Sequence, residues 1–172
     1  MNRLADPRTT HSPLRLSLLR HGAAHSGPKD DYDRALTEAG KREIDRVAEQ
    51  LRVLGEQPDR VLTSTAKRAF DSAHRLCRAL GWPAATIEAF DELYLAPASA
   101  LWLSLRTVTD TDRHVLMVGH NPGISEFYQQ LTGDFASLAM NTGELRTVLP
   151  AIHSWRDLRA LGTNAALSAT SA

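Results

Sequence analysis

The sequence lacks several features that would set it apart from ordinary globular proteins. It has one cysteine, Cys77, so no disulfide can form within the chain, which indicates a reducing compartment. No stretch reaches the roughly 18 apolar residues of a membrane-spanning helix, and residues 1–13 hold no apolar run that could serve as a secretion signal. We therefore expect a cytoplasmic protein with no membrane partner.

An excess of charge of one sign is also missing. Twenty Lys and Arg residues balance 20 Asp and Glu residues, which gives a formal net charge of zero. Proteins that bind nucleic acid or anionic lipid over a broad surface carry an excess of basic residues. The sequence therefore indicates no nucleic-acid partner, and any anion that it binds must meet a local cluster of positive charge.

The composition that remains is that of one folded unit. The chain has 172 residues, of which 42% are hydrophobic and 23% are charged, as in average soluble domains. Residues 1–13 and 162–172 lack apolar periodicity, so we expect a flexible N-terminal segment, a domain over residues 14–161 and a flexible C-terminal tail. We expect a monomer.

Strand patterns and helix patterns alternate along this domain. Strands are predicted over residues 14–19, 60–63, 85–89, 114–118 and 144–149. Helices are predicted after Thr37, with Ile44, Val47, Leu51 and Leu54 on one face and a stop at Gly55, after Ser64, through Leu101 and Leu105, and from Asn121-Pro122. This alternation predicts an α/β fold, a three-layer sandwich in which helices flank a mainly parallel sheet.

Polar residues follow four of the predicted strands. Arg20 and His21 end the first strand, Arg68 comes shortly after the second, Glu92 follows the third and His120 ends the fourth. The carboxyl ends of parallel strands meet at one edge of a sheet, where ligands bind in such folds. We therefore expect these five side chains to lie close together.

These residue types suit a phosphoryl group. The planar forks of Arg20 and Arg68 can each contact two phosphoryl oxygens, and two adjacent cations disfavour the protonated form of His21. A protonated His120 can neutralise charge that develops in the transition state, and Gly22 lets the backbone pass close to a ligand. The pattern predicts phosphoryl transfer in which His21 is the nucleophile.

The runs LLRHG, STAKRA and VGHNPG resemble, in this order, the histidine phosphatase superfamily, which is also called phosphoglycerate-mutase-like. The spacing of LRHG and ALTEAG, the ending GHNPG and the lack of an inserted cap domain are most similar to the short SixA-type phosphohistidine phosphatases. The resemblance covers residues 14–150. It implies that His21 becomes phosphorylated, that Arg20 and Arg68 bind the phosphoryl group and that His120 completes the pocket.

Two further assignments concern the proton donor and metal ions. We take Glu92 in DELYLA as the donor, with Asp91 as the alternative, and we expect Ser64 to cap its helix. His21 and His25 have a spacing that metal ligands use on helices, but they lie in a glycine-containing loop without a third ligand. We therefore expect no metal ion and no cofactor.

The predicted reaction has two steps, in which His21 takes the phosphoryl group and water then removes it. A chain without a cap domain leaves its pocket open to a bulky substrate, so phosphohistidine on a partner protein is favoured. A phosphomonoesterase for a small phosphorylated metabolite is the main alternative. A non-catalytic module that recognises phosphate or a phosphoprotein is a third reading.

Overall fold

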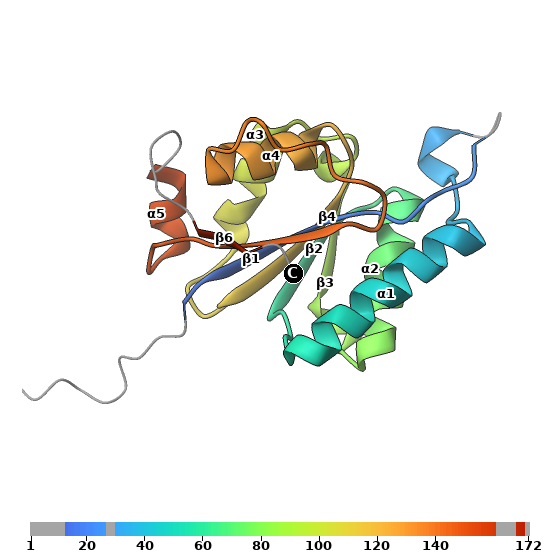
Figure 1. Cartoon of the computed structure of the whole chain (residues 1–172), viewed down its shortest axis with the longest axis horizontal. Coiled ribbons are helices and arrows are strands. Elements are labelled where there is room, and N and C mark those ends of the chain that lie inside the picture. The colour runs from blue at the N-terminus through green and yellow to red at the C-terminus, as the bar shows by residue number, and fades with distance from the viewer. Residues whose placement is uncertain (1–12, 27–29, 161–167, 171–172) are drawn as a thin grey trace, which may run out of the picture.

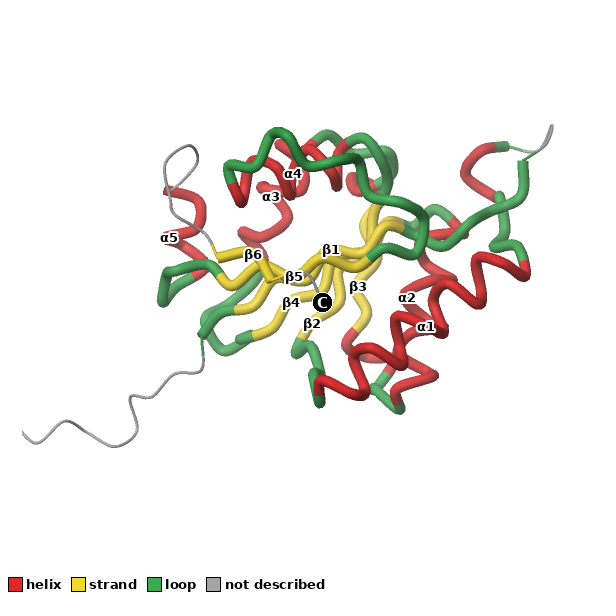
Figure 2. Tube along the Cα trace, viewed as in Figure 1, coloured by secondary structure: helices red, strands yellow, loops and turns green. Residues whose placement is uncertain are grey.

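A computed structural model describes residues 13–26, 30–160 and 168–170. Its centre is a six-stranded sheet in the order β3-β2-β4-β1-β5-β6 (Figures 1 and 2). The strands are β1 (Arg15–Arg20), β2 (Arg60–Ser64), β3 (Ile87–Phe90), β4 (His114–Gly119), β5 (Leu145–Leu149) and β6 (Ser168–Thr170). The first four strands in this spatial order are parallel, whereas β5 and β6 are antiparallel to their neighbours. The expected mainly parallel sheet is confirmed.

Helices cover both faces of the sheet and complete the three-layer sandwich (Figure 1). One face carries α1 (Glu38–Leu54) and α2 (Lys67–Leu80), and the other carries α3 (Ala98–Ser104) and α4 (Gly123–Thr132). A short helix, α5 (Trp155–Ala160), lies beside β6, and single 3₁₀ turns are η1 (Asp31–Asp33), η2 (Ala84–Thr86), η3 (Asp91–Leu93) and η4 (Leu105–Thr107). The predicted α/β sandwich is therefore correct.

The side chains that point from the sheet form two separate hydrophobic cores. Alternate residues of a strand point to opposite faces, so in β1 Leu16 and Leu18 join the core under α3 and α4. Leu19, in contrast, packs with α1 and α2, where Ile44 and Leu76 are fully buried. Burial on both faces fixes the register of β1, which determines where the strand ends.

Most helix boundaries follow the local signals in the sequence. Thr37 caps α1 by accepting a hydrogen bond from the Gly40 amide, and Gly55 ends the helix with a left-handed φ of 65°. The expected buried face was wrong at Leu54, which is 52% exposed because α1 ends there at the rim of the core. The helix predicted at Pro122 begins one residue later, with Pro122 as its N-cap.

Ser64 does not cap α2 at the position that we expected. The N-cap residue is Ala66, and the Ser64 hydroxyl accepts a hydrogen bond from the Ala66 amide over 3.1 Å. The side chain thus orders the turn between β2 and α2 rather than the first helical turn. Ser64 is completely buried at this point.

Only a small part of the two predicted flexible ends lies within the described residues. Residues 168–170 pair with β5, so this part of the predicted flexible tail is a strand and the expectation is corrected there. The sequence signals were weak because the strand is only three residues long. The predicted N-terminal segment, apart from Pro13, and the tail residues 162–167 and 171–172 lie outside the described residues.

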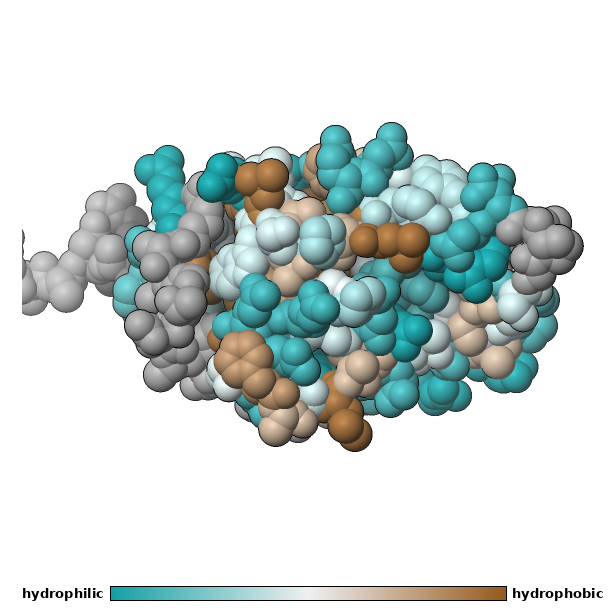
Figure 3. Space-filling model, turned by 90° about the horizontal axis from the view of Figure 1, so that it is seen from above, coloured by the Kyte–Doolittle hydropathy of each residue, from teal (hydrophilic) through white to brown (hydrophobic). Residues whose placement is uncertain are grey.

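The outer surface is ordinary for a globular protein. The face above α3 and α4 is mostly hydrophilic, and its hydrophobic side chains stand in separate spots (Figure 3).

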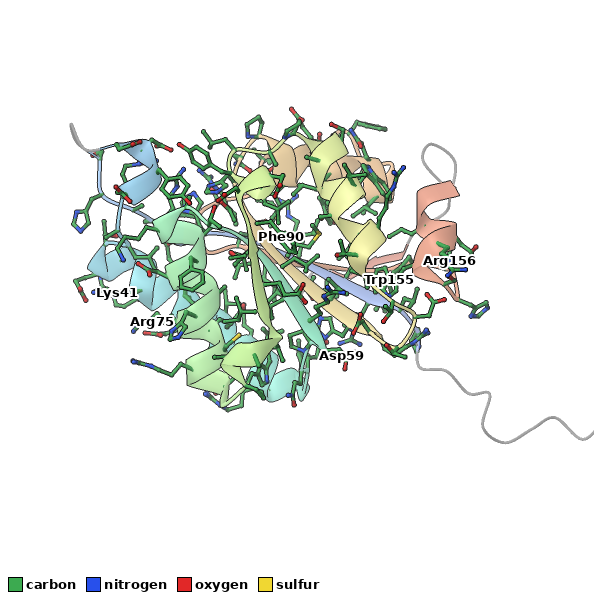
Figure 4. The ribbon with its side chains drawn as sticks, turned by 180° about the vertical axis from the view of Figure 1, so that it is seen from behind. Lys41, Asp59, Arg75, Phe90, Trp155 and Arg156 are labelled. Carbon is green, nitrogen blue, oxygen red and sulfur yellow. The ribbon has the colours of Figure 1, made fainter. Side chains whose placement is uncertain are left out.

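At the amino-terminal ends of the parallel strands, Trp155 is fully buried and its indole donates to the Asp112 carbonyl over 2.5 Å (Figure 4). No helix of the described part is long and apolar enough to cross a membrane.

Candidate active site

The adjacent parallel strands β1 and β4 bring two histidines to one edge of the sheet. Arg20 pairs with Gly119 at the ends of these strands, and the His21 amide donates to the Gly119 carbonyl over 3.1 Å. His21 and His120 therefore leave the sheet side by side, with ring centroids 5.0 Å apart. Both rings line an open pocket of about 300 Å³.

Arg68 reaches the same pocket from the first turn of α2. Its side chain is buried, and each donor group of the guanidinium has a partner. The Nε group donates to His21 Nε2 over 3.2 Å, one terminal nitrogen donates to the Asp31 carbonyl over 2.5 Å, and the other donates to the Asp31 carboxylate over 2.9 Å. Arg20 and Arg34 also line the pocket, so three guanidiniums surround it.

The hydrogen bonds of His21 define its tautomer. Nδ1 lies 2.8 Å from the Gly22 carbonyl, which can only accept, so Nδ1 carries the proton. Nε2 then carries the lone pair, which accepts the hydrogen bond from Arg68 Nε. Burial, together with the smaller effect of the charges of Arg68 and Arg20, lowers the pKa of His21 to about 4, against the opposing effect of the Gly22 hydrogen bond. His21 is therefore a neutral imidazole at neutral pH, with its Nε2 lone pair held toward Arg68.

His120 is only 4% exposed, yet neither of its ring nitrogens has a hydrogen-bond partner among the described residues. Burial lowers its pKa to about 3, and the neighbouring His21 and Arg68 contribute in the same direction. Polar atoms that are buried without partners are costly and rare in folded proteins. His120 lines the open pocket, so its ring nitrogens can meet a bound molecule there, and a neutral imidazole can still donate one hydrogen bond to an anionic oxygen.

The backbone after His21 is held by two close contacts. A Cβ atom on Gly22 would lie 2.6 Å from the Gly40 carbonyl oxygen, and one on Gly40 would lie 2.0 Å from the Ala23 carbonyl oxygen. Gly22 was expected to give room for a ligand, but the structure shows that it gives room for α1. Ser72 on α2 accepts from the Gly22 amide over 3.1 Å and donates to the Arg68 carbonyl over 2.7 Å.

Three site residues were not predicted from the sequence: Asp31, Arg34 and Tyr94. The Asp31 carboxylate accepts hydrogen bonds from Tyr94 over 2.7 Å and from Arg68, and it pairs with Arg34 at 2.7 Å. The hydrogen bond from Tyr94, followed by those from Arg68, lowers the pKa of Asp31 to about 2. Tyr94 also packs its ring edge-on against His120, with centroids 5.8 Å apart.

Glu92, the predicted proton donor, does not lie with the other four residues. It is exposed on η3 and lines a separate hollow with Leu93 and Leu103. The segment after β3 does reach the site, where Tyr94 contacts Asp31 and Leu95 lines the pocket, but Glu92 on η3 lies on the side of the hollow next to α3. Asp91, the alternative, accepts hydrogen bonds from Thr65 and Tyr32 and does not line the pocket either.

Comparisons with known proteins agree with this arrangement. A family model described as the histidine phosphatase superfamily (branch 1) matches residues 16–107. The chain belongs to the histidine phosphatase superfamily. The matched segment contains Arg20, His21, Asp31 and Arg68, whereas His120 lies beyond it. No curated protein matches the sequence significantly.

Solved structures place this histidine phosphatase near the SixA proteins. A protein of Agrobacterium tumefaciens assigned as the phosphohistidine phosphatase SixA is 31% identical, with a TM-score of 0.72, over 81% of this chain and 94% of that one. A protein assigned likewise from Nakamurella multipartitia is 26% identical, with a TM-score of 0.75, over 92% and 95%. A mycobacterial glucosyl-3-phosphoglycerate phosphatase shares the fold at 17% identity, with a TM-score of 0.66, over 92% and 97%.

Among the described residues, no group of three or more His, Cys, Asp or Glu side chains is placed to hold a metal ion. The positive charge of this histidine phosphatase site comes from guanidiniums, which keep their charge at every relevant pH. The pocket therefore combines three guanidiniums, the Asp31 carboxylate, one neutral imidazole on His21 and one imidazole on His120 whose ring nitrogens have no partner among the described residues. That combination can bind a phosphoryl group and accept it covalently.

Proposed function

We propose that the protein is a phosphatase that works through a phosphohistidine intermediate on His21 and removes phosphate from phosphohistidine on a partner protein. The observation that carries the proposal is the tautomer of His21. The Gly22 carbonyl holds the proton on Nδ1, so Nε2 carries the lone pair and can attack phosphorus once a phosphoryl oxygen replaces it as the acceptor for Arg68 Nε. The lowered pKa of His21, about 4, supports a neutral nucleophile at physiological pH.

In the first step, Nε2 of His21 forms a bond to phosphorus, and the bond between phosphorus and the leaving group breaks with its electron pair. The charge on the three equatorial oxygens is stabilised by the neighbouring guanidiniums and by a donor on His120. In the second step, water attacks phosphorus and the bond to Nε2 breaks. Because Nδ1 keeps its proton throughout, His21 leaves as neutral imidazole.

The substrate class is inferred from the acids in the pocket. An alkyl phosphate expels a strongly basic alkoxide and needs a proton donor. Among the described residues that line the pocket, Asp31 is the one carboxyl group, and its pKa of about 2 keeps it ionised near neutral pH. Phosphohistidine needs no such donor when its remote nitrogen is protonated, because the ring then leaves as neutral imidazole.

The likeness to proteins assigned as SixA supports the same substrate class. The open pocket is also consistent with a group carried by a protein, since no helical domain in the described part of the chain covers the site. The likeness to a glucosyl-3-phosphoglycerate phosphatase keeps a small metabolite as the second candidate. The two candidates differ in leaving group, and an experiment can separate them on that ground.

The test combines covalent trapping with a comparison of substrates. The protein is mixed with a phosphohistidine-bearing protein, quenched in alkali and analysed by mass spectrometry, and a phosphoryl group is expected on His21. His21→Ala should lose both the label and turnover, whereas His25→Ala, a change of an exposed histidine nearby, should keep both. Substantial turnover by His21→Ala would contradict the covalent mechanism.

The second arm compares single-turnover rates for phosphohistidine and for a phosphorylated sugar. We expect phosphohistidine to react at least about 10²-fold faster than the sugar phosphate. This is roughly the factor by which the lack of a proton donor slows the reaction of an alkyl phosphate. Faster reaction of the sugar phosphate would replace the proposed substrate class with a small metabolite. Absence of turnover with every substrate, together with phosphate binding, would favour a non-catalytic module.

A further inference from the structure

Leu95, at the mouth of the pocket, has an unusual backbone conformation. Its φ is 45°, and it is the one non-glycine residue with a positive φ in the part of the chain that the structure describes. Side chains with a Cβ atom rarely adopt this left-handed region, which glycine adopts freely and asparagine and aspartate tolerate. Leu95 therefore holds a strained conformation beside the reacting groups.

The residues on both sides of Leu95 are fixed, which forces the turn onto this position. Tyr94 donates its amide to the Asp91 carbonyl over 3.0 Å and its hydroxyl to Asp31 over 2.7 Å. On the other side, the Ala96 carbonyl lies against the start of α4, where a Cβ atom on Gly123 would come within 1.8 Å of the Ala96 oxygen. The chain can pass between these two anchors with a glycine at position 95, yet it carries leucine.

The leucine side chain gains little from the fold itself. It is 49% exposed, and it lines the same pocket as His21, Arg68 and His120. Strained residues cluster at functional sites, and an observed outlier of this kind points to a role for its side chain. An apolar group at the rim of a pocket of cations and imidazoles is suited to contact an uncharged part of the substrate.

We propose that Leu95 is a specificity-determining residue that packs against the imidazole ring of the phosphohistidine substrate. The phosphoryl group enters between the guanidiniums and His21, so the ring that carries it remains at the mouth of the pocket, beside Leu95. This inference rests on the proposed function, which supplies the ring. It adds a contact that recognises the leaving group, whereas the arginines recognise the phosphoryl group.

The test uses two substrates that share a phosphorus–nitrogen bond. A phosphohistidine-bearing peptide has an imidazole leaving group, and phosphoramidate has ammonia, which offers no ring. For Leu95→Ala and Leu95→Gly we expect the ratio of kcat/KM for the peptide to kcat/KM for phosphoramidate to fall about fivefold, the effect of a partly lost apolar contact. Leu103→Ala, which shortens a leucine of similar exposure outside the pocket, should not change the ratio.

Two variants at position 95 separate contact from folding. Leu95→Gly relieves the left-handed strain, so it should unfold at a temperature no lower than that of Leu95→Ala. An equal loss on both substrates would mean that Leu95 only shapes the pocket, and an unchanged ratio would remove it from substrate recognition. Either result overturns this inference while leaving the proposed function in place. Failure of the unmodified protein to react with either substrate would overturn both.

Discussion

Arg68 donates through Nε to His21 Nε2 over 3.2 Å while its two terminal nitrogens contact Asp31. One guanidinium thus contacts both Nε2, the atom that we propose as the nucleophile, and a carboxylate at the position that an anionic ligand would occupy. When a phosphoryl group enters, its oxygens compete with Asp31 for the same donors. The side chain is 2% exposed, so it has little freedom to turn elsewhere. We therefore propose that Arg68 couples the binding of phosphate to the placement of His21.

Replacement of Arg68 by lysine should be severe although the charge is kept. A lysine ammonium is a point charge that cannot contact His21 and two phosphoryl oxygens in one plane. Hydrogen bonds to charged groups contribute about 1.5–3 kcal/mol each, so the loss of one or two predicts a fall in kcat/KM of about 100-fold. Steady-state kinetics with phosphohistidine measure this change.

Two control variants belong with this experiment. Arg78→Lys alters an exposed arginine on the same helix and should keep normal kinetics. Glu92→Gln should also react normally, because the structure places Glu92 in a separate hollow. Near-normal kinetics of Arg68→Lys would show that the guanidinium geometry is not needed, and a large loss in Glu92→Gln would return that residue to the mechanism.

Asp31→Asn should tighten the binding of inorganic phosphate. The substitution removes a negative charge from the pocket lining but keeps an oxygen that can accept from Arg68 and Tyr94. Repulsion between the carboxylate and the phosphate dianion is screened, because the side chain is partly exposed. We therefore expect the inhibition constant for phosphate to fall about three- to tenfold.

The matched control for this variant is Asp33→Asn, which removes an exposed carboxylate from the same 3₁₀ turn. It should leave the inhibition constant unchanged. Weaker phosphate binding by Asp31→Asn would show instead that the carboxylate is required to hold Arg68 in position.

The sequence predicted those site residues whose position depends on the sheet alone. Arg20, His21 and His120 end the adjacent strands β1 and β4, so buried strand patterns were sufficient to bring them together. Glu92 was misplaced because the strand pattern does not indicate which residue after β3 faces the pocket: Tyr94 and Leu95 reach the site, whereas Glu92 lines a separate hollow. The direction of each side chain in this turn comes from its packing against other elements, which local patterns do not contain.

Asp31 and Arg34 could not be predicted because a loop brings them to the site. The loop leaves the sheet after His21 and returns through an isolated bridge between Ala24 and Leu36. Its acidic run KDDYD has the composition of an exposed segment, and only the return of the chain at ALTEAG places Asp31 over Arg68. The glycine of ALTEAG was a signal for this return of the chain, since Gly40 is needed where α1 crosses the backbone of Ala23.

Gly40→Ala should destabilise the protein, although alanine is normally the better residue in a helix by about 1 kcal/mol. The added Cβ atom would lie 2.0 Å from the Ala23 carbonyl oxygen, so α1 must move away from the segment that carries His21. Overpacking of this kind predicts a loss of about 2 kcal/mol in the free energy of unfolding, together with lower kcat/KM. Urea unfolding measures the first effect.

The neighbouring Ala39→Gly is the reference for helix propensity, because Ala39 is exposed in the same turn. It should cost about 1 kcal/mol and leave kinetics normal. If Gly40→Ala stabilised the protein, the close approach of α1 to Ala23 would not exist in solution.

Mild acid should destabilise the fold through its buried histidines. Burial lowers the pKa of His21 and of His114 to about 4 and that of His120 to about 3, whereas an unfolded histidine has a pKa of about 6.5. Between pH 6.5 and 4 the unfolded chain therefore binds more protons than the folded one, so the free energy of unfolding falls as pH falls. Each imidazole contributes a slope of up to about 1.4 kcal/mol per pH unit.

His114 provides a test of this slope that does not disturb the active site. It lies at the opposite end of β4, where its Nε2 is 2.9 Å from the buried Ser17 hydroxyl. His114→Asn keeps polar atoms for this contact but cannot titrate, so the fall in unfolding free energy between pH 6.5 and 5 should become smaller by about one third. Urea titrations at these pH values measure it. This pH interval lies above the one in which Asp31 titrates. Because the pKa of Asp31 is lowered to about 2, its protonation reduces the free energy of unfolding only in stronger acid. Stability that stays constant from pH 6.5 to 5 would mean that these imidazoles are hydrated and take up protons without unfolding the chain.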